Sequence, residues 1–170
     1  MDHSSAFSIR PATEDDVPTV LQFIRELAEY EKLSHEVTAT EEQLRAELFG
    51  EARRAEILLP CANGIVVGFA LFFHNFSTFL GKPGLYVEDL FIRPAFRGKG
   101  YARALMIQLA RIARERGCGR FEWAVLDWNE PATEFYRSLG ASSMSEWTIQ
   151  RVTGSELEAL ADRPLFGAEI

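Results

Sequence analysis

The residues Arg97-Gly98-Lys99-Gly100-Tyr101-Ala102 combine closely spaced glycines with cationic side chains, directly before the most regular helical pattern of the chain. Glycines allow neighbouring backbone amides to converge, and a helix that begins there adds the positive end of its dipole. A turn of this kind binds anions, and its size suits a pyrophosphate group. Arg97 and Lys99 would supply further positive charge.

Two common phosphate-binding motifs do not fit this turn. A Walker P-loop needs a glycine five positions before the Gly-Lys pair, where Arg93 stands. The dinucleotide-binding fingerprint needs a third glycine where Arg103 stands. What remains is an Arg-x-x-Gly-x-Ala pattern from Arg97 through Gly100 to Ala102. By itself, this pattern is also compatible with a glycine-rich connection that binds nothing.

The turn lies in a chain of strand and helix patterns that must position it. Strands are expected over residues 7–10, 56–59, 65–76, 85–92, 121–126 and 143–152, and helices after Thr13 and Thr40, over 102–116 and 132–139, and from Ser155. Some strands are joined by hairpins, such as the one at Asn63-Gly64, and others by helices. The order predicts an α/β (α+β) fold with a mixed sheet covered by helices.

The composition indicates a globular protein and excludes several classes. With 170 residues and 47% hydrophobic residues, we expect one domain over residues 1–170. The formal net charge of -7 disfavours nucleic acid as a partner. Neither a signal peptide nor an apolar run of membrane length is present, so we expect a cytoplasmic protein without a membrane partner. Cys61 and Cys118 suggest no disulfide framework, and the histidines lack metal-ligand spacing, so no metal is expected.

Several stretches resemble one family. The Arg-x-x-Gly-x-Ala turn is similar to the pyrophosphate-binding motif of the GNAT family of N-acetyltransferases. Wider matches point to its branch that acts on diamines, on polyamines such as spermidine and spermine, and on thialysine. They cover residues 9–13, 26–31, 85–89, 128–131, 135–136 and 140–142. The resemblance implies a mixed, mostly antiparallel central sheet flanked by helices, with splayed central strands that bind acyl-CoA.

The resemblance implies acetyl-CoA as cosubstrate. The strand from Glu88 to Ile92 would splay from the strand over residues 121–126, and the pantetheine arm would lie between them. An amide near Ile92 would polarise the thioester carbonyl, and the glycine turn would hold the pyrophosphate. The implied cofactor-binding residues are Leu90, Phe91, Ile92, Arg97, Gly98, Lys99, Gly100, Tyr101, Ala102, Arg103, Asn129, Glu130, Pro131, Ala132 and Tyr136.

The reaction of a thioester with an amine requires proton transfers. An alkyl amine with a pKa of about 10.4 is protonated at neutral pH and must lose a proton before it attacks. The resemblance implies Glu88 as the base, acting through a water. The reference pKa of Glu, about 4.3, would have to be raised by burial or by Asp89. Tyr136 would protonate the departing CoA thiolate. Direct attack needs no cysteine nucleophile.

The resemblance also implies that Tyr30, Glu31 and Glu88 face the amine substrate, and Glu146 is the nearest candidate for a further acidic contact. These residues also have structural alternatives: Glu88 as a solvated strand residue, Tyr136 as a core residue of its helix, Tyr30 as packing at a helix end, and Glu31 as part of a solvated face.

Three functions follow from these residues. The first is an N-acetyltransferase for a small cationic amine, namely a polyamine, a diamine or a lysine-like amino acid. The second is a peptide or protein N-acetyltransferase, and the third is a non-catalytic acyl-CoA-binding sensor. Acidic residues near Tyr30 favour the first, and the presence of Tyr136 together with Glu88 argues against the third. The resemblance further implies a homodimer whose interface involves the segment from Ser143 onward.

Overall fold

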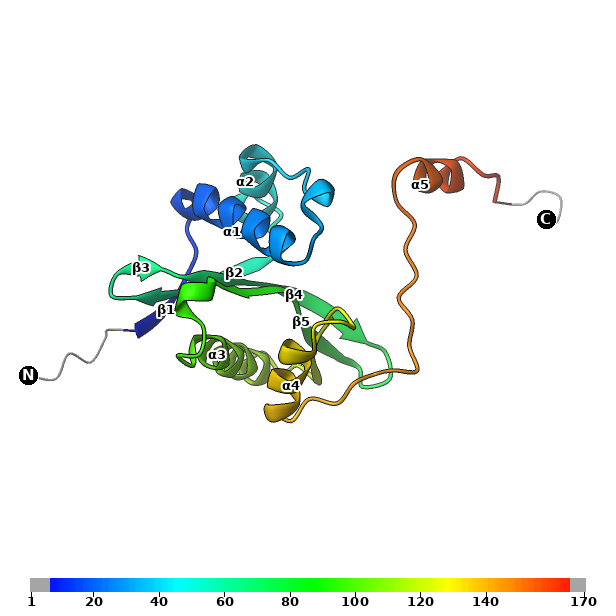
Figure 1. The fold of residues 1–170 in the computed structure, drawn as a ribbon. Helices are drawn as coiled ribbons and strands as arrows, with labels where there is room; N and C mark the ends of the chain where they lie inside the picture. The colour runs from blue at the N-terminus through cyan, green and yellow to red at the C-terminus, as the bar shows by residue number, and fades with distance from the viewer. Residues whose placement is uncertain (1–6, 166–170) are drawn as a thin grey trace, which may run out of the picture. The chain divides into compact units, whose positions relative to one another are not determined.

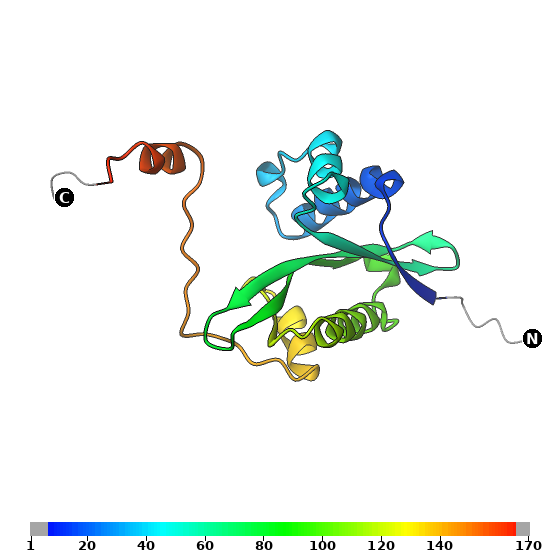
Figure 2. The same ribbon diagram turned by 180° about the vertical axis from the view of Figure 1, so that it is seen from behind.

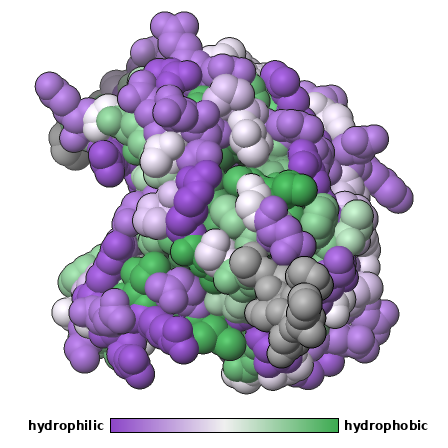
Figure 3. Space-filling model, turned by 90° about the vertical axis from the view of Figure 1, so that its left-hand side faces the viewer, coloured by the Kyte–Doolittle hydropathy of each residue, from purple (hydrophilic) through white to green (hydrophobic). Residues whose placement is uncertain are grey.

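The computed structural model of the protein describes residues 7–165 (Figure 1). The chain divides into two compact units, one up to Ala124 and one from Val125 onward. No helix among the described residues is long and apolar enough to cross a lipid bilayer. On the face shown in Figure 3, hydrophilic side chains predominate and apolar ones form small patches between them.

The first unit is built on a six-stranded sheet in the order β1-β2-β4-β5-β6, with β3 paired to β2. All pairings are antiparallel except the parallel one between β5 and β6. The expected mixed, mostly antiparallel sheet is therefore confirmed. The strands are β1 (Phe7–Pro11), β2 (Glu56–Ala62), β3 (Ile65–Val66), β4 (Gly68–Ser77), β5 (Lys82–Ile92) and β6 (Arg120–Trp123).

Helices cover both faces of this sheet (Figures 1 and 2). The helices α1 (Val17–Tyr30) and α2 (Glu41–Phe49) lie on one face, and α3 (Tyr101–Glu115) lies on the other. Phe23 of α1 packs with Phe69 of β4 and Phe91 of β5 in the core beneath α1. Single-turn 3₁₀ helices occupy Glu14–Asp16, Ser34–Glu36 and Pro94–Phe96.

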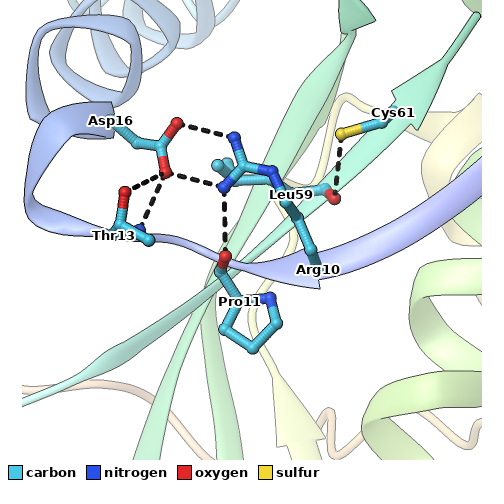
Figure 4. A network of polar contacts seen from close by, with 6 residues as sticks. All are labelled: Arg10, Pro11, Thr13, Asp16, Leu59 and Cys61. Carbon is cyan, nitrogen blue, oxygen red and sulfur yellow. Dashed lines mark hydrogen bonds and ion pairs between the residues drawn. The ribbon is translucent and has the colours of Figure 1, made fainter. Parts of the chain in front are cut away.

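The start of α1 is fixed by an ion pair to β1 (Figure 4). Arg10 donates to both carboxylate oxygens of Asp16 at 2.7 Å, and the backbone N–H of Thr13 donates to the same carboxylate at 2.8 Å. The Arg10 guanidinium holds the pKa of Asp16 well below its usual range. The predicted cap at Thr13 is confirmed, with the detail that it caps the 3₁₀ turn leading into α1.

Other local signals are also confirmed. Thr40 caps α2 and forms a capping box with Gln43. Asn63 and Gly64 both have positive φ, 50° and 78°, in the two-residue turn between β2 and β3. The strand expected over residues 65–76 is divided at Val67, whose N–H donates to the carbonyl oxygen of Pro60.

The ladder between β5 and β6 is short. It joins Gly84–Val87 of β5 to Arg120–Trp123 and ends there, whereas β5 continues to Ile92. Within the described residues up to Ala124, the backbone from Asp89 to Ile92 thus pairs with β4 but with no strand on its other side. The pairing of β5 with β6 therefore ends at Val87, directly before Glu88.

The second unit contains α4 (Glu130–Ser138) and α5 (Gly154–Ala161). The expected strand over residues 143–152 is wrong, since this segment forms no ladder within the described part of the chain. A strand requires a partner strand, and an alternating pattern alone does not supply one. The terminal helix exists, but it begins at Gly154 with Thr153 as its N-cap, so the capping box expected from Ser155 is also wrong.

Candidate functional site

A β-bulge in β5 determines which side chains face α1. Leu71 of β4 pairs with Asp89, and the next residue, Phe72, pairs with Val87, which leaves Glu88 as an extra residue in β5. Residues paired across an antiparallel ladder share a face of the sheet. Bulges of this kind change the direction of side chains and are frequent beside active sites.

The bulge places Asp89 on the sheet face covered by α1. Its partner Leu71 packs against the core cluster beneath α1, and Phe91, two residues further along β5, belongs to that cluster. Burial raises the pKa of Asp89 to about 7, with smaller contributions from the negative charges of Glu88 and Glu31. A carboxyl group with this pKa exchanges protons near neutral pH.

Asp89 was expected from the sequence only as a charged neighbour of Glu88. The signal that could have revealed it is its position in an apolar strand, between Val87 and Phe91, both of which are buried. An acidic residue two positions from each of two buried residues is unusual, because a buried carboxylate is costly. Glu88 itself is exposed at the bulge, so the burial expected around the proposed base is found at Asp89 instead.

The C-terminal end of α1 brings Tyr30 and Glu31 to this region. Glu31 is half-buried, burial raises its pKa, and its charge acts on Asp89. The helix ends in a Schellman arrangement, in which Leu33 N–H donates to Ala28 and Lys32 N–H donates to Glu29. Lys32 adopts φ 62°, a left-handed conformation that favours glycine. The structure therefore brings the charge of Glu31, at the end of α1, to bear on Asp89 of β5 together with that of Glu88.

The glycine turn lies between the 3₁₀ helix Pro94–Phe96 and α3. Gly98 and Gly100 adopt φ 75° and 83°, and a side chain added at either would meet no atom within 4 Å, so the turn has open space beside it. The first N–H groups of α3 have no acceptor within the helix. Tyr101 stacks on Phe7 of β1, with ring centroids 4.5 Å apart, which fixes the first residue of the helix. These features fit an anionic group such as a pyrophosphate.

Two arginines flank this 3₁₀ helix and differ in their partners. Arg93 donates to both carboxylate oxygens of Glu26 at 2.9 and 2.7 Å and lies over the Phe23 ring. Arg97 turns toward β5 and α1: its Nε–H donates to the carbonyl oxygen of Ile92 at 2.8 Å, and its guanidinium lies 4.7 Å from the centroid of the Tyr30 ring. Sequence analysis did not foresee either set of contacts.

The remaining predicted residues belong to the second unit. Asn129 is the N-cap of α4, and its side-chain oxygen accepts from the Ala132 N–H at 3.4 Å. Glu130 and Pro131 form the first turn of this helix. Tyr136 is half-buried in α4 with its ring 5.2 Å from that of Phe135, and Glu146 is exposed after the helix. The predicted site residues thus fall into two sets, one in the unit up to Ala124 and one in the unit from Val125 onward.

No metal centre accompanies these groups in the described residues, because nowhere do three or more His, Cys, Asp or Glu side chains cluster suitably for a metal ion.

Comparisons with known proteins agree on one family. The sequence profile of the acetyltransferase (GNAT) family matches residues 21–141. The chain is 39% identical over 166 residues to a thialysine N-epsilon-acetyltransferase of Mus musculus, covering 91% of this chain and 97% of the relative. It is 32% identical over 203 residues to the L-ornithine N5-acetyltransferase NATA1 of Arabidopsis thaliana, covering 93% and 89%.

Solved structures agree with the fold. An integron cassette protein of V. cholerae superimposes with a TM-score of 0.78 at 28% identity, covering 92% of this chain and 98% of the other. An aminoglycoside N-acetyltransferase in complex with CoA superimposes with a TM-score of 0.72 at 18% identity, covering 89% and 98%.

Proposed function

This chain belongs to the acetyltransferase (GNAT) family and is an amine N-acetyltransferase. From that premise we propose that it transfers the acetyl group of acetyl-CoA to a primary amine of a small cationic substrate. The observation that carries the proposal is the group formed by Glu31, Glu88 and Asp89 beside the end of α1. The charges of Glu31 and Glu88 both act on Asp89, and a group of carboxylates of this kind attracts a cation.

Lysine-like amino acids are the substrates that we favour within this class. Two curated relatives that are matched over most of their length are named for thialysine and L-ornithine, which are amino acids with an amine in the side chain. Polyamines and diamines remain in the proposal, because a relative named spermidine/spermine N(1)-acetyltransferase-like protein 1 is 29% identical over 165 residues.

Acetyl-CoA would bind along β5 and the glycine turn. The backbone groups of Leu90, Phe91 and Ile92 are free of a strand partner on the β6 side within the described residues, which suits hydrogen bonds to a pantetheine arm. The pyrophosphate would lie on Gly98, Lys99, Gly100 and the first turn of α3 with Tyr101, Ala102 and Arg103. Asn129, Glu130, Pro131, Ala132 and Tyr136 complete the proposed cofactor contacts.

The proposed reaction divides the proton transfers among named residues. Asp89 and Glu31 hold the ammonium group, and Glu88 accepts a proton from it through a water. The neutral amine then attacks the thioester carbonyl, so that a C–N bond forms and the C–S bond breaks. Tyr136 donates a proton to the leaving thiolate, and the second proton of the amine passes to solvent. The products are an N-acetylated amine and CoA.

The test is release of CoA thiol from acetyl-CoA with a panel of amines: thialysine, ornithine, lysine, spermidine, spermine, putrescine and an N-terminal peptide. We expect rapid release with one small amine and slow release with the peptide. Release with peptide alone would replace the proposal by a peptide N-acetyltransferase. Binding of acetyl-CoA with no release for any amine would favour the sensor function.

The segment after α4 supports a proposal about assembly. Trp147 and Ile149 are 75% and 70% exposed, and their backbone pairs with no strand in the described residues. We propose that this segment lies at the interface of a homodimer.

We further propose that residues 1–170 act as one domain, since the family profile crosses the boundary between the two units. The cytoplasmic location and the absence of nucleic-acid and membrane partners stay predictions.

A further inference from the structure

Arg97 contacts three parts of the proposed site at once. Its backbone continues directly into the glycine turn at Gly98. Its Nε–H donates to the carbonyl oxygen of Ile92 at 2.8 Å, at the end of the strand proposed to bind the pantetheine arm. Its guanidinium lies over the rings of Tyr30 and Phe91, at 4.7 and 5.7 Å from their centroids. One side chain therefore links the anion-binding turn to the last residue of α1.

The contacts of Arg97 differ in kind from those of Arg93. Arg93 is held by a two-point ion pair with Glu26, which joins α1 to the residue that follows β5. No carboxylate within residues 7–165 lies at ion-pair distance from Arg97. Its hold on α1 depends on a cation–π contact, which is weaker and sensitive to geometry. The contact of Arg97 with α1 is therefore expected to change when the glycine turn changes its position.

The part of α1 that Arg97 contacts is readily disturbed. The last turn is closed by the N–H groups of Glu31, Lys32 and Leu33. Lys32 has φ 62°, which costs a residue with a side chain about 1 kcal/mol or more. Helix ends with few buried contacts open locally at low free-energy cost. The contact of Arg97 with Tyr30 can therefore change the fraction of time for which the turn at Glu31–Leu33 is closed.

We propose that Arg97 is a positioning residue that couples the anion-binding turn to the end of α1. An anion on the Gly98–Gly100 turn fixes the backbone at Arg97, and the guanidinium then holds Tyr30. The ordered turn presents Glu31 beside Asp89. Acetyl-CoA bound first would thus complete the amine-binding side. The coupling rests on the proposed function for the identity of its two ligands.

The test is hydrogen–deuterium exchange of the full-length protein with and without saturating CoA. The amides of Glu31, Lys32 and Leu33 report closure of the last turn of α1. We expect CoA to slow their exchange at least about fivefold, the lower range of coupling between two binding sites. In Arg97→Lys, which keeps the charge but loses the planar fork, we expect this protection to fall to less than half.

Two tyrosine variants and one lysine variant separate coupling from loss of fold or of affinity. Tyr30→Phe keeps the ring and should keep the protection, whereas Tyr30→Leu should lose it. Lys99→Gln removes a charge of the same turn, so it should weaken CoA binding yet keep the protection at saturation. Protection that is absent in the unmodified protein, or equal in Arg97→Lys, would overturn the coupling.

The amine panel distinguishes failure of the coupling from failure of the proposed function. Protection that depends on Arg97, without turnover of any amine, would retain the coupling and reject the function. Turnover of an amine, together with protection that is the same in Arg97→Lys as in the unmodified protein, would retain the function and reject the coupling.

Discussion

At the scale of single residues, the neighbours Glu88 and Asp89 have different surroundings although they share a strand. The bulge leaves Glu88 exposed, while Asp89 faces the α1 side of the sheet, where burial raises its pKa to about 7. Two carboxyl groups in such different environments suit different tasks. We assign proton acceptance to Glu88 and cation binding to Asp89.

For Glu88→Gln we expect kcat at neutral pH to fall about 10²-fold, the usual contribution of a general base. Partial recovery is expected at high pH, where more of the amine is already neutral. The measurement is CoA release between neutral and alkaline pH at saturating amine. A loss that is independent of pH would contradict the assignment of Glu88.

For Asp89→Asn we expect the KM for the amine to rise about tenfold, the effect of one lost hydrogen bond to a charge. In the unmodified protein, Asp89 gains its negative charge as pH rises through about 7, so the amine KM should fall over that range. The variant should lack this change. An unchanged pH profile of KM would reject cation binding by Asp89.

The same substitution should stabilise the fold above neutral pH. The folded protein keeps the Asp89 proton up to about pH 7, whereas an unfolded Asp releases it at about 3.9. The contribution of Asp89 to stability is therefore highest below its unfolded pKa of about 3.9, and it falls as pH rises from there to about 7. Asn cannot ionise, so the Tm of Asp89→Asn should exceed that of the unmodified protein at alkaline pH and nearly equal it at acidic pH. Equal Tm values under both conditions would contradict the burial of this group.

For Tyr136→Phe we expect turnover to fall about 10²-fold, while acetyl-CoA binding weakens much less, since only the hydroxyl proposed to protonate the thiolate is lost. Turnover and acetyl-CoA binding are measured separately. Unchanged turnover would remove Tyr136 as the acid.

At the scale of elements, the approach of α1 to the sheet depends on Arg10 and Asp16. Because the folded pKa of Asp16 is depressed, the pair contributes stability above the unfolded reference of about 3.9, and this is lost as pH falls through the folded value. Arg10 is 41% exposed, so solvent screens the pair, and Asp16→Asn should cost about 1 kcal/mol. The exposed pair of Arg45 with Glu14 is the control, and Glu14→Gln should change the free energy of unfolding by less. A smaller loss for Asp16→Asn than for Glu14→Gln would contradict this role.

The elements also show which features a sequence predicts. The caps at Thr13 and Thr40 and the turn at Asn63-Gly64 were predicted, because each depends on bonds within a few residues. The bulge at Glu88 and the break at Val67 were not, because each depends on how its strand pairs with a neighbouring strand and not on the residue types at the position itself. The strand over residues 143–152 failed for the same reason.

The candidate site follows a similar division. The glycine turn was evident from residue types, and Gly98 and Gly100 have the left-handed backbone that the turn requires. The position of Asp89 and the reach of Arg97 to Tyr30 depend on the approach of α1 to β5. No local pattern encodes that approach.

At the scale of the whole molecule, the proposed homodimer accounts for the apolar side chains of the segment after α4. We expect sedimentation of the full chain at micromolar concentration to show a dimer, and Trp147→Ser to shift it toward monomer. Phe79→Ser is the matched control, because Phe79 is 97% exposed but belongs to the β4–β5 connection. A monomeric unmodified protein would overturn the proposal.

The extra residue of β5 also bears on how this gene can vary. Loss of one codon from an ordinary strand moves every later side chain to the opposite face and disrupts the core. In β5, loss of the Glu88 codon would instead allow the ladder with β4 to close into a regular one, because Glu88 has no partner there. Such an allele would encode a protein that still folds but lacks the proposed base. Under the proposed role of Glu88, stably folded descendants with little activity are thus one deletion away.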